Sequence, residues 1–476
     1  MNFETVIGIE IHCELKTNTK MFSGSKVGFH DPVNTNVNEV DLGMPGSLPT
    51  INKRGVEQAL KACHIFNMSI NPLLTFDRKC YFYPDLTKGY QITQNDFPIG
   101  TNGSITIELE DYKKQINIDK VVIEEDTAQL KHYDDYTLID YNRAGTPLIE
   151  IISDASMRTA KEASTYVATL RNMLEYADIS DAKMEEGSLR CDVNVSIRPY
   201  GQEKFGTKTE IKNLNSISNI ERAIAFEISR QEKLILSGET IASETRRFDE
   251  ATKTTIKMRG KDGVIDYRFH REPNLIPTRI DNSIIEGVKK EIPLMPAALK
   301  ELYINEYGIS LTDAKILTNN IKISNYFNET ILLTSNYKTV TNWIITEIFT
   351  YLNKNNISIE QQSLTPKGLA KMINLMDEGL ISSKQLKQIF EIVNKTQNDD
   401  IDKIVKENNM AMISNEAEIL VFINNAIENN PASVQDYKDG KDRAIKFLLG
   451  QIMKNSKGQV NPKLTNELLI EKLKTL

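Results

Sequence analysis

The sequence predicts an α+β protein in which strands dominate the first 290 residues and helices dominate the rest. Before residue 290, several segments alternate apolar and polar residues, as half-buried strands do. Beyond Pro296, apolar residues recur at helical spacing instead. The segment 291–296 contains two prolines and cannot propagate a helix, so we expect a domain boundary there. A length of 476 residues is too great for one ordinary core and predicts two or three domains.

The composition excludes several classes of protein. With 40% hydrophobic and 26% charged residues, the chain has the composition of a soluble globular protein. It has no apolar run long enough for a membrane span and no leader with a basic start, so we expect a cytoplasmic protein without membrane contact. The net charge of −7 means that any nucleic-acid contact must come from local patches or partners. The cysteines form no CxxC pair, which fits a reducing compartment and predicts neither disulfides nor a cysteine zinc site; they are Cys13, Cys63, Cys80 and Cys191.

Residues 5–15 predict the first strand. Isoleucines occupy one of its faces, whereas Glu10, His12 and Glu14 occupy the other. This polar face is either part of a functional site or an ordinary strand face turned to solvent.

Two segments in the next third of the sequence combine charge with strand patterns. Residues 76–94 interleave cations with aromatic rings, a pattern that suits phosphates and stacked bases. The alternative is a strand that packs these rings on the core. Residues 121–126 form another strand, which ends in three consecutive acids.

Three further strands each place an acid among apolar residues. The turn-forming run 142–147 leads into a strand that carries Glu150 between isoleucines. Asp192 and Glu210 occupy similar positions in two later strands. A carboxylate in an apolar strand is costly unless a cation or hydrogen-bond donors meet it.

Helices and a hairpin separate or follow these strands. Capping boxes are expected at Thr159 and at Ser218, and the second helix should end at Gly238. Residues 245–257 predict a hairpin.

The last 42 residues, 435–476, are basic within an acidic chain, with nine Lys or Arg against five Asp or Glu. We expect a helix at 442–454 whose cations point outward. This pattern favours contact with an RNA backbone, and its alternative is a solvated helix face.

If the acid-bearing strands share one sheet, their polar faces form a single acidic surface. Crowded carboxylates repel one another unless hard cations neutralise them, and oxygen ligands with one imidazole suit Mg²⁺. Basic residues lie close to these acids in sequence. Enzymes that transfer phosphoryl groups use magnesium together with basic residues. The chain contains no phosphate-binding glycine loop, dinucleotide-binding motif or serine-hydrolase elbow. The basic residues are Arg78, Lys79, Arg143, Arg190, Lys208 and Lys212.

The motif Asp-Tyr-Asn-Arg-Ala-Gly-Thr-Pro-Leu-Ile-Glu at 140–150 is long and therefore specific. With it, the chain closely resembles the bacterial GatB family, whose members belong to the glutamyl-tRNA(Gln)/aspartyl-tRNA(Asn) amidotransferase (the GatCAB complex). The resemblance runs the whole length of the chain. Its other segments are 7–14, 77–94, 124–126, 184–194, 210–215 and 450–462.

The resemblance implies three domains. These are a cradle-like antiparallel-sheet catalytic domain at 1–293, an all-helical domain at 294–405, and a helical tail at 406–476 that is similar to YqeY and contacts tRNA. It also implies a carbon–nitrogen ligase that acts in a heterotrimer with an amidase subunit and a small subunit. The amidase releases ammonia from glutamine. The GatB-type chain uses ATP and Mg²⁺ to phosphorylate the side-chain carboxylate of misacylated Glu-tRNA(Gln) or Asp-tRNA(Asn), and ammonia then displaces phosphate.

The resemblance also assigns roles to residues of this chain. Glu125, Glu150 and Glu210 are expected to be catalytic. Candidates for binding ATP or the acceptor end are Lys79, Arg143, Arg190 and Lys208. The residues expected around the metal are Glu10, His12, Glu125, Glu150, Asp192 and Glu210.

Departures from the family pattern keep two other functions open. Residues 267–275 replace a usual Phe-Pro by His270-Arg271, which favours a divergent or second copy. The rival functions are a non-catalytic tRNA-binding scaffold and an enzyme that amidates a different carboxylate. Many relatives hold zinc with four cysteines, so no structural zinc is expected here, where the corresponding positions are Ser23, Ser25, Asn38 and Asp41.

Overall fold

The computed structural model of the chain describes residues 2–28, 30–258, 266–413, 415–441, 443–456 and 458–475. The chain divides into two compact units, Met1–Pro296 and Ala297–Leu476. The domain limits expected at residues 293 and 405 stay predictions. None of the described helices combines the length and the apolar character needed to cross a membrane.

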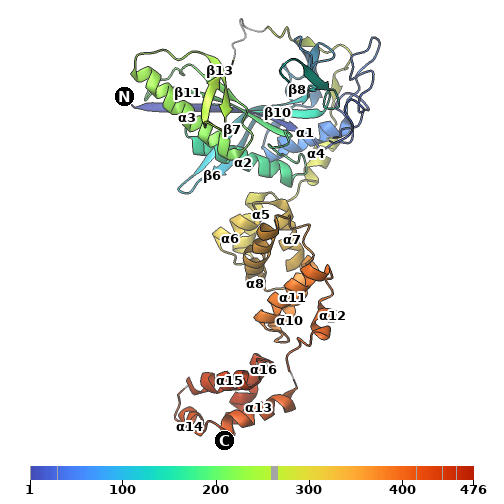
Figure 1. Cartoon of the computed structure of the whole chain (residues 1–476). Coiled ribbons are helices and arrows are strands. Elements are labelled where there is room, and N and C mark those ends of the chain that lie inside the picture. Colours follow the sequence, from blue (N-terminus) through green and yellow to red (C-terminus); the bar gives the residue numbers. More distant parts are fainter. Residues whose placement is uncertain are drawn as a thin grey trace. The chain divides into compact units, whose positions relative to one another are not determined.

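A nine-stranded sheet forms the centre of the N-terminal unit, in the order β14-β13-β12-β11-β1-β10-β7-β6-β2 (Figure 1). The α+β class is confirmed, but the sheet is mixed, because β12 and β13 run parallel whereas its other neighbouring strands are antiparallel. The strands in sheet order are Thr254–Lys257, Glu244–Asp249, Thr209–Lys212, Leu189–Pro199, Phe3–Glu14, Pro147–Ser153, Lys113–Glu125, Gly100–Glu108 and Ser69–Ile70.

The two faces of this sheet differ as the alternation predicts. In β1, the side chains of Ile7, Ile9 and Ile11 are fully or almost fully buried in the main core. Helices α1, α2 and α3 cover this apolar face (Figure 1). The four strands expected to carry acids, β1, β10, β11 and β12, lie side by side in the sheet, so their polar residues share the opposite face. The helices of this unit are α1 Lys53–Ile65, α2 Ala160–Tyr176, α3 Ile217–Leu236 and α4 Asn282–Lys290.

Serine and threonine side chains fix where the two long helices begin. The Thr159 hydroxyl accepts a hydrogen bond from the Glu162 N–H and caps α2, but the Glu162 carboxylate accepts from the Arg158 N–H, so the reciprocal bond of the expected capping box goes to the preceding residue. Helix α3 begins two residues earlier than the sequence predicts, because Ser216 and not Ser218 accepts the capping bond, from the Asn219 N–H. Ser216 has extended backbone dihedrals, whereas Ser218 already lies within the helix.

Three smaller sheets complete the N-terminal unit. One has the order β15-β4-β5, and the other two are the pairs β16-β3 and β8-β9. Their strands are β15 His270–Arg271, β4 Asp77–Cys80, β5 Tyr90–Thr93, β16 Thr278–Arg279, β3 Leu73–Leu74, β8 Gln129–His132 and β9 Thr137–Asp140.

The C-terminal unit is helical in its described residues (Figure 1). The basic helix expected at 442–454 is α15, although Asp442 lies outside the described residues. Its apolar side packs with α13 and α16. The helices are α5 Pro296–Asn305, α6 Leu311–Leu317, α7 Ile321–Ile331, α8 Tyr337–Asn342, the π-helix η1 Trp343–Ile348, α9 Phe349–Asn355, α10 Pro366–Asp377, α11 Ser383–Thr396, α12 Ile401–Glu407, α13 Glu416–Glu428, α14 Pro431–Lys438, α15 Arg443–Asn455 and α16 Pro462–Lys474.

A buried carboxylate on α3 fastens the edge strands of the large sheet. The fully buried Glu227 lies 2.6 Å from Arg230 and 3.8 Å from Arg246 of β13, and accepts a hydrogen bond from Thr255 of β14. Glu227→Gln should lower the free energy of unfolding by about 2 kcal/mol, because it removes a buried charged partner and leaves Arg230 and Arg246 to share Glu244. Urea denaturation followed by circular dichroism measures this, with the exposed Glu239→Gln as a matched control. Equal stability of the two variants would contradict a fastening role.

Candidate active site

The strand register gathers most of the predicted acids into rows on one face of the sheet. His12 of β1 lies opposite Glu150 of β10 on one side and Arg190 of β11 on the other. In the next row, Glu10 lies opposite Asp192. Paired residues of neighbouring strands project to the same face, so these side chains meet although they are far apart in sequence.

One cluster on this face has the composition of a cation site. The Nε2 atom of His12 lies 3.8 Å from a carboxylate oxygen of Glu124 and 3.8 Å from one of Glu150. The three ligand atoms lie within 4.8 Å of one another. Two oxygens and one imidazole nitrogen at this spacing suit an octahedral cation after a small contraction, since ligands of Mg²⁺ lie about 3 to 4 Å apart.

Burial and crowding set the charges in this cluster. Burial lowers the pKa of His12 despite the nearby Glu124 carboxylate, so the imidazole is neutral and its ring nitrogen can bind a cation. Burial, with the negative charge of Glu124, raises the pKa of Glu150 to about 8. The protonated Glu150 thereby relieves repulsion between the two acids.

Glu124 was not among the candidates, which included its neighbour Glu125. In β7, Glu124 pairs with Leu148 and so shares the face of the acids. The Glu124 carboxylate accepts hydrogen bonds from Thr93, at 2.5 Å, and Gln91, at 3.3 Å. These bonds fix its orientation toward the cluster. The alternation of side chains within β7 could have identified Glu124 from the sequence.

Glu125 lies outside the cluster of His12, Glu124 and Glu150. Its carboxylate forms an ion pair with Lys88 and accepts a hydrogen bond from the Ile92 N–H at 3.0 Å. The structure therefore gives Glu125 a cationic partner of its own, and its catalytic role stays a prediction.

A second group of acids surrounds Lys212. Its ammonium lies 2.6 Å from Asp192 and 3.1 Å from Glu210. Burial opposes the ionisation of Glu210, but a hydrogen bond from Thr245 and the charge of Lys212 hold its pKa below the ordinary value. These two acids thus share one cationic partner within the protein. Glu10 accepts a hydrogen bond from Asn194 at 3.2 Å.

The two candidate arginines meet at one acid that the sequence did not single out. Arg190 lies 2.7 Å and Arg143 lies 3.7 Å from the same oxygen of the buried Asp126. Burial opposes the ionisation of Asp126, but the two guanidinium groups lower its pKa below the ordinary value. Arg143 also donates hydrogen bonds to the carbonyl oxygens of Thr127 and Ala128.

The two candidate lysines differ in position. The Lys79 ammonium lies 5.2 Å from the ring centroid of Tyr267, and its charge reaches Glu150. Lys208 is exposed and contributes to the lowered pKa of Glu210.

Residues at the positions of the family's zinc cysteines form a hydrogen-bonded group. Ser23 donates to Asp41 at 2.7 Å, and the fully buried Lys20 lies 3.3 Å from the other Asp41 oxygen. The Asn38 N–H also donates to Asp41. This loop therefore contains a buried ion pair between Lys20 and Asp41.

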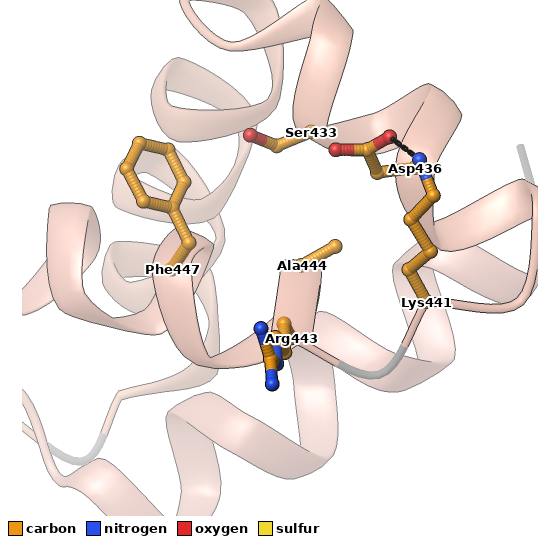
Figure 2. Close-up of a pocket in the computed structure, with 6 residues that line it drawn as sticks. All are labelled: Ser433, Asp436, Lys441, Arg443, Ala444 and Phe447. Carbon is orange, nitrogen blue, oxygen red and sulfur yellow. Dashed lines mark hydrogen bonds and ion pairs between the residues drawn. The ribbon is translucent and has the colours of Figure 1, made fainter.

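The C-terminal unit contains a cavity of about 700 Å³. Figure 2 shows its walls, where the Lys441 ammonium lies 2.7 Å from Asp436. The ring of Phe447 is 47% exposed, and Arg443 lines the same cavity. An exposed ring with cations is a combination that binds unpaired bases and phosphates. The remaining lining residues are Ser433 and Ala444.

Comparison with known proteins covers almost the whole chain. Residues 5–286 match the GatB/GatE catalytic domain, and residues 325–473 match the GatB domain. Three relatives are named as the B subunits of aspartyl/glutamyl-tRNA(Asn/Gln) amidotransferases. The chain is 49% identical to that of Oceanobacillus iheyensis over 475 residues, which are 99% of both chains. It is 48% identical to that of Mesoplasma florum, over 99% of this chain and 98% of the relative, and 48% identical to that of Bacillus velezensis over all of both.

The cluster of His12, Glu124 and Glu150 should bind Mg²⁺ more tightly as the pH rises from 6 to 8. Because the pKa of Glu150 is raised to about 8, the cation must displace a proton below that pH. Each pH unit below 8 should weaken binding by about tenfold, which titration calorimetry of the chain measures. Glu150→Gln should abolish this dependence, and a variant with the same pH dependence as the unaltered chain would contradict the assignment.

Proposed function

The chain belongs to the GatB family, and from this premise we propose that it is the component of a tRNA-dependent amidotransferase that activates and amidates a tRNA-bound amino acid. The observation that carries this proposal is the 48–49% identity to amidotransferase B subunits over nearly the full length of the chain. The cluster of His12, Glu124 and Glu150 supports it with a site suited to phosphoryl transfer.

The proposed reaction has two steps. An oxygen of the side-chain carboxylate of Glu on tRNA(Gln), or of Asp on tRNA(Asn), attacks the γ-phosphorus of ATP, and ADP leaves. Ammonia then attacks the carbonyl carbon of the acyl phosphate, inorganic phosphate leaves, and the nitrogen loses a proton to give the amide. The nitrogen comes from glutamine hydrolysed by an amidase subunit, with which this chain and a small subunit form a heterotrimer.

Mg²⁺ supplies neutralising charge for the transferred phosphoryl group. The residues proposed to hold it are the neutral imidazole of His12 and the carboxylates of Glu124 and Glu150. Thr93 and Gln91 hold the Glu124 carboxylate in place, so little reorganisation accompanies binding.

The other candidate residues have proposed roles around this cluster. Arg143 and Arg190 are each fixed by Asp126, and their remaining N–H groups are proposed to hold the acceptor end of the tRNA. Lys79 is proposed to contact the phosphates of ATP. Glu125, Glu150 and Glu210 keep the catalytic roles proposed for them, while Glu10 and Asp192 occupy the adjoining row of the same face.

Reconstitution with the amidase and small subunits tests the function. With Glu-tRNA(Gln), ATP, Mg²⁺ and glutamine, the tRNA recovered should carry glutamine, and chromatography of the released amino acid identifies it. Glu150→Gln should lower amide formation at least about a hundredfold while glutamine hydrolysis stays detectable, because only the phosphoryl-transfer site is altered.

The same assay separates the rival functions. Unchanged glutamate on the tRNA calls for the same test with Asp-tRNA(Asn). Failure with both substrates would contradict the proposal and favour a tRNA-binding scaffold or an enzyme that amidates a different carboxylate.

The cavity of the C-terminal unit is the proposed tRNA contact of the tail. Phe447→Ala should weaken tRNA binding about tenfold, since stacking of a base on an aromatic ring contributes roughly 1–3 kcal/mol. Filter binding of the purified heterotrimer measures this. Lys338→Gln, an exposed change on α8, should leave binding unaltered, and equal affinities of both variants would contradict the assignment.

A further inference from the structure

Most cations around the acids already have an acidic partner. A nearby carboxylate offsets part or all of a cation's charge, so the cation has less charge to offer a phosphate. The pairs are Lys212 with Asp192 and Glu210, Arg190 and Arg143 with Asp126, Lys88 with Glu125, and Arg78 with Glu272.

Two lysines near Glu150 differ from these. Within the part of the chain that the structure describes, no carboxylate oxygen lies within 4 Å of the ammonium of Lys79 or Lys120. The positive charges of both nevertheless reach Glu150, whose pKa they lower against the effect of its burial. Both ammonium groups are therefore near the site without an ion pair within 4 Å, although the charge of Lys120 also acts on its neighbour Asp119.

The strand register fixes the position of Lys120. On β7, Lys120 and Glu124 lie two residues to either side of Val122, so all three share one face. Val122 pairs with Glu150 of β10, which makes Lys120 and Glu150 diagonal neighbours within reach of a long side chain. Lys120 is half-buried, between Ile152 on β10 and Thr101 on β6.

Lys79 approaches Glu150 from a different sheet. It lies on β4 opposite Gln91 of β5, and the amide of Gln91 donates to Glu124. Lys79 thus approaches the cluster from the side of Glu124. Lys120 lies on β7 four residues before Glu124, on the same face of that strand.

We propose that Lys120 binds the phosphoryl group that is transferred from ATP, acting together with Lys79. This inference rests on the proposed function, because it needs ATP and a carboxylate substrate at the acid face. Both reactants are anionic, and the face they approach carries Glu10, Glu124 and Glu150. A half-buried ammonium without an acidic partner is the group on this face that can neutralise the γ-phosphate oxygens.

Lys120 keeps its proton throughout. The bond that forms joins the substrate carboxylate oxygen to the γ-phosphorus, and the bond that breaks joins that phosphorus to the oxygen bridging to the β-phosphate. Lys120 donates N–H groups to the oxygens of the moving phosphoryl group, so it is a binding residue before and after the transfer.

The test compares ATP with ADP, because only ATP carries the group that Lys120 is inferred to bind. In the purified heterotrimer with Mg²⁺, Lys120→Gln should weaken binding of ATP about tenfold and that of ADP less than about twofold, as measured by titration calorimetry. Lys120→Arg should restore most of the ATP affinity, since it keeps the positive charge. Lys113→Gln is the matched control on the same strand, because Lys113 is exposed, pairs with Glu108, and lies about 23 Å along β7 from Lys120.

Each outcome decides the inference. Equal loss for ATP and ADP, or no loss for either, would overturn it even if the unaltered heterotrimer amidates Glu-tRNA(Gln). If the unaltered heterotrimer binds no ATP, both this inference and the proposed function are overturned. An ATP-selective loss that Lys120→Arg rescues, with Lys113→Gln unchanged, would establish Lys120 as a phosphoryl-binding residue.

Discussion

The central strand β1 pairs with β10 along one edge and with β11 along the other, and the site depends on the register of these two ladders. His12 stands opposite Glu150 and Arg190 in one row, and Glu10 stands opposite Asp192 in the next. A slip of one residue in either ladder would turn the acids of one strand into the core and its isoleucines into the site. The apolar face, packed on α1, α2 and α3, therefore specifies the chemistry of the polar face.

Charge compensation divides the acid face into two parts. Lys212 forms ion pairs with Asp192 and Glu210 in one part, and the arginines form ion pairs with Asp126, so these acids have cationic partners in the protein alone. In the other part, Glu124 accepts hydrogen bonds from the neutral Thr93 and Gln91, and Glu124 and Glu150 lie beside a neutral His12 with lysines farther away. The carboxylates of Glu124 and Glu150 therefore repel each other, and a bound cation or a proton on Glu150 relieves this repulsion.

Sequence patterns predicted those parts of the fold that local periodicity determines. Alternation located the strands of Glu10, Glu150 and Asp192, but whether these strands share one sheet was left open by the sequence and is shown by the structure. The paired positions did not follow, since register is set by contacts between distant segments. Alternation within β7 could have separated Glu124 from Glu125, but the position of Lys120 relative to Glu150 depends on the register, and Lys120 was overlooked. Lys120 directly follows Asp119 in sequence, but its position beside Glu150 comes from the pairing of β7 with β10.

The altered segment 267–275 contacts the strand that carries Lys79. Glu272, which is almost fully buried, accepts two hydrogen bonds from Arg78 at 2.6 and 3.1 Å, so β15 stays attached to the strand that carries Lys79. The substituted residues His270 and Arg271 are exposed, but they form β15 itself: His270 Nδ1 lies 3.8 Å from Cys80 Sγ, and Arg271 lies 3.6 Å from the buried Asp77. The replacement of Phe-Pro therefore places two polar side chains against the two ends of the strand that carries Lys79. An effect of the altered segment on substrate choice would act through β4 and Lys79, because β15 pairs with that strand.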